Sequence, residues 1–104
     1  MLTYTPPIKD LHFVLSDLLN AAPRLSALSG YEEVDDALIM EIAEQAGRFA
    51  TEVVFPLNSV GDRHGCSFND GQVRTPPGFA EAYQQFVQGG WPSRTCDPEY
   101  GGQG

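Results

Sequence analysis

The sequence predicts an all-α fold, a small bundle of about three main helices with one short β-hairpin. Two observations lead to this prediction. In three segments the apolar residues recur every three or four positions, which places them on one face of a helix. Between the second and third segments, Asp70-Gly71 separates two very short extended stretches, as in a tight hairpin. A chain of 104 residues is long enough for one small domain with a modest core.

The first helix is predicted over residues 10–20. Its apolar stripe is Leu11, Val14, Leu15, Leu18 and Leu19. Pro6 and Pro7 oppose regular hydrogen bonding before it, and Pro23 disfavours its continuation. Residues 21–30 are therefore expected to form a loop.

The second and longest helix is predicted to begin after Asp35, which is a good N-cap residue. About five helical turns follow, with one face expected to join the core. That face carries Leu38, Ile42, Ala46, Phe49 and Val53, widened by Ile39, Ala43 and Ala50. Pro56 removes the hydrogen bond to Glu52 and is expected to kink or end the helix. Gly61 is expected to close any helical turn that follows.

The hairpin is predicted between Gly65 and Arg74, and the third helix directly after it. Thr75 is the expected cap of this helix and Pro76 its first residue, with Gly89-Gly90 ending it. Its apolar side, which we expect in the core, carries Phe79, Tyr83, Phe86 and Val87. Residues 91–104 are rich in proline and glycine and show no periodicity.

The chain is strongly acidic, with a net charge of −8, which argues against nucleic-acid partners and anionic membrane surfaces. The acidic residues concentrate around the start of the second helix, at Glu32, Glu33, Asp35, Asp36, Glu41 and Glu44. We interpret this cluster as a solvated helix face rather than a docking site. No apolar run is long enough to span a bilayer, and the N-terminus lacks the order of a signal peptide, so a cytoplasmic protein is expected.

Residue chemistry predicts no catalytic, cofactor-binding or metal-binding residue in this chain. His12 and His64 are the only histidines, and His64 lies two residues from Cys66 without a third group to orient it. His64-Gly65-Cys66 offers at most two ligands to a metal. Cys66 and Cys96 have no CxxC partner and are expected to be free thiols. The terminal Gly-Gly-Gln-Gly lacks the strand, helix and lysine of a phosphate loop.

The order of the loop residues resembles the N-terminal domain of the acyl-CoA dehydrogenase family. The resemblance spans Val34 to Gly104 and rests on Asp62-Arg63, Gly90-Trp91 and, most specifically, the stretch Pro98 to Gly104. Residues 4–15 resemble the leader of a bacterial branch of that family that includes methylmercaptopropionyl-CoA dehydrogenase. Arg94 departs from the small and apolar residues that relatives have between Trp91 and Asp97. Residues 1–33 are thus interpreted as a leader with the first helix and a loop, and 34–104 as the helical domain, truncated before the middle β domain.

The resemblance implies a parent enzyme that uses FAD to convert an acyl-CoA to a 2-enoyl-CoA. In that family the base and the flavin contacts lie in later domains, so this chain is expected to bind no FAD, to help wall the acyl pocket and to be inactive alone. Its partners would be the remaining domains of the parent, and acyl-CoA in the parent. A face left uncovered would favour self-association into a homo-oligomer. The alternative is a free-standing acidic helical protein-interaction module.

Overall fold

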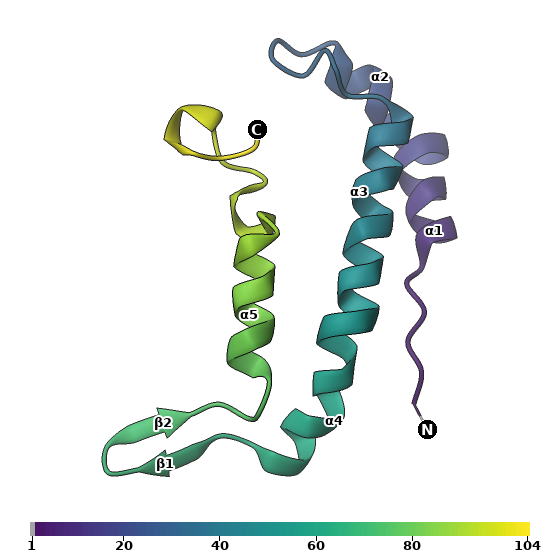
Figure 1. Ribbon diagram of the computed structural model, residues 1–104. Helices are drawn as coiled ribbons and strands as arrows, with labels where there is room; N and C mark the ends of the chain where they lie inside the picture. Colours follow the sequence, from purple (N-terminus) through teal and green to yellow (C-terminus); the bar gives the residue numbers. More distant parts are fainter. Residues whose placement is uncertain (1) are drawn as a thin grey trace. The chain divides into compact units, whose positions relative to one another are not determined.

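The computed structural model describes residues 2–104, which are mostly helical with one two-stranded hairpin (Figure 1). The all-α fold class with a short hairpin is therefore confirmed. The chain divides into two compact units, one up to Phe55 and one from Pro56 to Gly104. Each unit is described by itself.

The first helix of the N-terminal unit begins directly after Pro7. It comprises α1 (Ile8–His12) and a π-helical continuation, η1 (Phe13–Leu18). The expected helix over 10–20 is thus present, with its start two residues earlier. The wider π-helical turn accounts for hydrogen bonds such as that from Leu19 N to Val14 O, 2.9 Å long.

Residues 21–30 do not form the expected loop, because a further helix, α2 (Ala21–Ser26), occupies most of them. Asn20, in the left-handed conformation with φ 51°, separates it from η1. Pro23 lies in the first turn of α2. A proline is tolerated there because its missing N–H would have no partner within the helix. Pro23 therefore allows a new helix to start although it opposes continuation of the old one.

The long helix begins where the sequence predicts and ends later. It comprises α3 (Asp36–Phe49), the π-helical η2 (Ala50–Val54) and α4 (Phe55–His64). Asp35 caps it, since its carboxylate accepts a hydrogen bond of 2.8 Å from Leu38 N. Helical hydrogen bonding continues past Pro56. A π-helical turn precedes this proline, and such turns commonly occur where the regular hydrogen bonding of a helix is interrupted.

Gly61 does not close the helix, contrary to expectation. The helix continues to His64, and Gly65 ends it with a φ of +60°. The Gly65 N–H donates to the Gly61 carbonyl over 2.9 Å. A left-handed residue after the last turn is the usual way a helix ends, and glycine adopts it without strain.

The C-terminal unit contains the predicted hairpin. Strands β1 (Ser67–Asn69) and β2 (Gln72–Arg74) pair antiparallel, with Phe68 opposite Val73. Asp70 and Gly71 both have positive φ angles, 49° and 77°, as a two-residue hairpin turn with the twist of its strands requires.

The next helix, α5 (Phe79–Gln88), starts three residues after the predicted first residue Pro76. Pro77 disfavours helical geometry at the residue before it, so Pro76 cannot open a helix. Gly78, with φ +87°, is the N-cap instead of Thr75. After α5 the chain forms two 3-10 turns, η3 (Trp91–Ser93) and η4 (Pro98–Tyr100).

The predicted apolar core is not formed within residues 2–104, where no apolar side chain is fully buried. Leu38 of α3 remains 39% exposed, and Tyr83 and Val87 of α5 remain 65% and 47% exposed. A helix buries its apolar stripe only against a second layer of structure. The stripes of α3 and α5 are therefore real, but the expectation that they form a core is wrong.

Candidate functional site

The histidines and cysteines do not assemble into a reactive site. The His64 ring Nδ1 lies 3.0 Å from the Val60 carbonyl oxygen of its own helix, while Cys66 is a free, exposed thiol. Cys96 is likewise free and exposed. Over residues 2–104 no three His, Cys, Asp or Glu side chains are grouped as metal ligands would be. None of the helices described is both long and apolar enough to cross a membrane.

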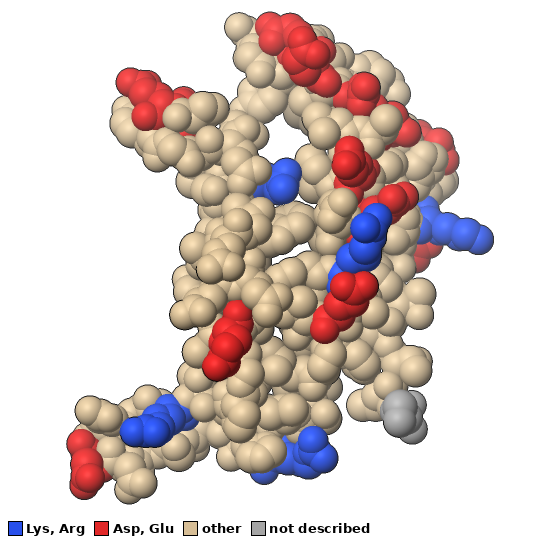
Figure 2. Space-filling model, viewed as in Figure 1, with Lys and Arg blue, Asp and Glu red and all other residues tan. Residues whose placement is uncertain are grey.

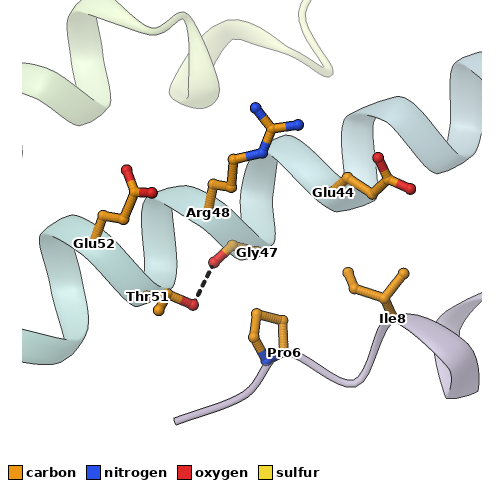
Figure 3. A pocket seen from close by; sticks show the side chains of 7 residues that line it. All are labelled: Pro6, Ile8, Glu44, Gly47, Arg48, Thr51 and Glu52. Atoms are coloured by element: carbon orange, nitrogen blue, oxygen red, sulfur yellow. Dashed lines mark hydrogen bonds between the residues drawn. The ribbon is translucent and has the colours of Figure 1, made fainter.

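A shallow hollow lies where the N-terminal arm, residues 2–18, runs along α3 (Figure 3). Gly47 is buried at the closest approach, and the side chains of Pro6 and Ile8 face it. A Cβ atom at Gly47 would lie 3.0 Å from Pro6 and 3.3 Å from Ile8. Glycine at this position therefore allows the arm to contact the helix backbone.

The same arm is held at two further points along the long helix. Near the beginning of the arm, the Tyr4 ring stacks on Phe55 with 6.0 Å between ring centroids. Near the end of the arm, His12 Nε2 lies 3.5 Å from Asp36 Oδ2, and the Ser16 hydroxyl donates to Asp36 Oδ1. His12 and Asp36 are about half exposed, so their ion pair adds little to stability.

The acidic cluster has local structural roles, which supports its interpretation as a solvated face. Figure 2 shows acidic side chains gathered over the end of the N-terminal unit where α2 and the start of α3 lie. Asp35 caps α3. The backbone N–H groups of Glu32 itself and of Gly30 hold the pKa of the Glu32 carboxyl below its usual value of 4.5. Asp35 and Glu32 are thus engaged by nearby backbone N–H groups and Asp36 by His12 and Ser16, which accounts for these carboxylates without a substrate.

The hollow beside Gly47 does not fit a flavin cofactor. Two carboxylates, Glu44 and Glu52, flank the single guanidinium of Arg48 along its rim (Figure 3). A flavin dinucleotide carries a diphosphate, which this pair of carboxylates would repel. The apolar part of the wall is confined to Pro6 and Ile8 of the arm and the backbone at Gly47. The hollow thus follows the line of contact between the arm and α3.

Glycines in the C-terminal loop have packing roles. A Cβ atom at Gly89 would lie 3.0 Å from the Trp91 indole nitrogen. A Cβ atom at Gly102 would overlap the Cys96 carbonyl group, and one at Gly90 would overlap the Gln103 side chain. These close approaches explain why Gly89, Gly90 and Gly102 are glycines, so no phosphate ligand is needed to account for them.

Exposed apolar side chains are the other prominent feature of the C-terminal unit. Phe68 and Val73 form a cross-strand pair on the hairpin and are 72% and 67% exposed. An isolated two-stranded hairpin is marginally stable in water, and large apolar patches usually mark a contact surface. The C-terminal unit therefore presents surfaces suited to being covered by other protein.

No protein-family model matches the chain. A curated relative, the 3-methylmercaptopropionyl-CoA dehydrogenase of Ruegeria pomeroyi, is 36% identical over 103 residues. That match covers 99% of this chain and 17% of the relative, so the chain spans about a sixth of the relative's length. The resemblance drawn from residues 34–104 and from the leader is confirmed. Over nearly its whole length, the chain matches one segment of an acyl-CoA dehydrogenase.

Proposed function

We propose that this chain is the N-terminal helical part of an FAD-dependent acyl-CoA dehydrogenase and that it is inactive alone. The observation that carries the proposal is the 36% identity over 99% of the chain, combined with coverage of only 17% of the relative. The exposed apolar side chains of α5 and of the hairpin support it, because they provide faces for further domains to cover.

In this proposal the residues divide into a leader, 1–33, and a helical domain, 34–104, that precedes a middle β domain. The helical domain helps to wall the acyl pocket of the parent. The base that takes a proton from the acyl-CoA and the groups that hold FAD belong to the later domains. No residue of this chain is assigned a catalytic, cofactor-binding or metal-binding role. The proposed compartment is the cytoplasm.

Flavin titration tests the proposal. The 104-residue chain is expected to show no saturable FAD binding and no acyl-CoA oxidation with a dye acceptor. The matched control is the complete product of the reading frame that contains this segment, which is expected to bind FAD and reduce the dye. Stoichiometric yellow protein from the 104-residue chain would overturn the assignment of the cofactor site to later domains. A complete product without FAD binding would overturn the proposed family function.

The isolated chain is also proposed to self-associate, because several large apolar side chains among residues 2–104 are exposed to solvent. Tyr83 and Val87 of α5 and the hairpin pair Phe68 and Val73 are the most exposed of the relevant side chains. Sedimentation velocity from micromolar to millimolar concentration should show a concentration-dependent dimer or larger species. Substituting Phe68 and Val73 together with threonine, which retains β propensity, should reduce it. A strict monomer across the whole range would contradict this expectation.

A further inference from the structure

Arg94 and Trp91 form a stacked pair in the C-terminal loop. Residues 91–93 form the turn η3, and Arg94 follows it as the C-cap residue. This turn brings the guanidinium carbon of Arg94 to 4.7 Å from the centroid of the Trp91 ring. That distance is within the range of favourable cation–π attraction. The guanidinium plane is therefore held against an aromatic surface.

One donor of the Arg94 guanidinium, the Nε–H group, lacks an acceptor among residues 2–104. Its Nε atom is buried and has no hydrogen-bond partner. A buried charged donor without a partner is costly, and guanidinium groups are rarely left so. Among residues 2–104, the structure shows an ion pair between His12 and Asp36 and none between Arg94 and a carboxylate. Asp97, the nearest acid along the chain, accepts a hydrogen bond of 2.8 Å from Glu99 N instead.

The terminal nitrogens of Arg94 remain open to a ligand. Of the Arg94 nitrogens, only Nε is both buried and unpaired. Dehydration of Nε weakens the competition of water for the guanidinium charge, which strengthens its attraction for an anion at the open edge.

The loop around Arg94 is held in place before any ligand arrives. The Gln103 side-chain amide donates to the Gly90 carbonyl over 2.7 Å and lies 3.4 Å from Ser93 Oγ. The Gln103 backbone N–H donates to the Ser93 carbonyl over 3.0 Å. These bonds fasten the turn that presents Arg94, so little conformational freedom is left to lose on binding.

We propose that Arg94, stacked on Trp91, is a binding site for an oxyanion, a carboxylate or phosphate group supplied from outside this chain. The planar guanidinium offers paired N–H donors that match two oxygens of such a group. This site requires neither FAD nor catalysis, so it stands independently of the proposed enzyme function. Its arginine is also the residue that departs from the small and apolar residues of the resembling family.

Trp91 is the single tryptophan of the chain, so all tryptophan emission comes from the residue that contacts Arg94. The 104-residue chain is titrated separately with inorganic phosphate and with acetate, at ionic strength held constant with sodium chloride. A saturable change in Trp91 emission is expected with at least one of the two oxyanions and not with chloride. A response to phosphate alone identifies a phosphate ligand, and one to acetate alone identifies a carboxylate. No saturable response to either overturns the proposal.

Two substitutions separate site binding from general charge. Arg94→Met keeps the length of the stem and is expected to weaken oxyanion binding at least about tenfold, because the donors are lost. Arg74→Met removes the same charge from the exposed hairpin and should leave binding unchanged. Equal binding by the wild type and Arg94→Met, or equal loss in both variants, overturns the proposal.

The wild-type chain supplies a second readout that does not depend on the variants folding. The Arg94 Nε–Hε resonance should move with the same saturation curve as the Trp91 emission. A resonance that does not move during a saturable fluorescence change would place the anion elsewhere and overturn the assignment to Arg94.

Discussion

Gly47→Leu is expected to detach the N-terminal arm, residues 2–18, from α3. A Cβ atom at this position would already lie 3.0 Å from Pro6 Cβ and 3.0 Å from Pro6 Cγ. The remaining atoms of leucine have no room while Pro6 and Ile8 stay in place. Overpacking of this kind costs about 1–3 kcal/mol. The arm contacts α3 at only a few points, so the steric cost is relieved most readily by its release.

Release should also melt the helix of the arm. The helical segment Ile8–Leu18 is shorter than the roughly 12–15 residues at which isolated helices become even marginally stable in water. Hydrogen exchange should therefore show that the amides of residues 11–18 lose most of their protection in Gly47→Leu.

The matched control for this substitution is Ala46→Leu. Ala46 is the preceding residue of α3 and is exposed, so the same apolar side chain is added where it meets no arm residue. Protection of residues 11–18 should be retained in this control. Equal loss of protection in both variants, or none in Gly47→Leu, would contradict the contact between the arm and Gly47.

Gly102→Ala is expected to open the C-terminal loop. The added Cβ would overlap the carbonyl carbon and oxygen of Cys96, which are backbone atoms and cannot rotate away as a side chain can. Two backbone hydrogen bonds close the loop here. Gln103 N donates to Ser93 O over 3.0 Å, and Gly104 N donates to Cys96 O over 2.9 Å. Loss of both would cost roughly 1–3 kcal/mol, at about 0.5–1.5 kcal/mol for each bond.

The opening of the loop is measured by hydrogen exchange at the amides of Gln103 and Gly104. Both amides should exchange at nearly the rate of an unstructured peptide in Gly102→Ala. Gly101→Asn is the control, since Gly101 has no atoms near its Cβ position and asparagine tolerates its φ of +87° better than other residues. Unchanged protection in Gly102→Ala would show that the approach to Cys96 is not essential to the loop.

Elements with a local physical cause were predictable from the sequence. The cap at Asp35, the apolar stripe of α3 and the Asp70-Gly71 turn each depend on a few neighbouring residues, and the structure confirms all three. Two of the errors arise at prolines. Pro23 was interpreted as a stop although it lies in the first turn of α2, and Pro76 as a start although Pro77 follows it. Whether a proline stops a helix or starts one depends on its position relative to the first turn and on the residue that follows it. The boundaries of helices are the part of the fold that a sequence pattern predicts least well.

Features that depend on residues far apart in the chain were not predictable. The sequence cannot distinguish an apolar stripe that enters a core from one that stays exposed, and Tyr83 and Val87 show the second outcome. The contact of Pro6 with Gly47 joins distant segments, although a glycine inside a helix indicates a close approach. Arg94 departs from the small and apolar residues of the resembling family, but its contact with Trp91 depends on the η3 turn, which no periodicity indicates.

The central claim is that these residues form the N-terminal part of a larger acyl-CoA dehydrogenase. The measurement that tests it most directly is the sequence of the native transcript downstream of the codon for Gly104. Because the match covers 17% of the relative, the account predicts that the reading frame continues for several hundred codons and encodes a β domain followed by further helices. A natural stop codon directly after Gly104 would contradict it and would favour a free-standing acidic interaction module.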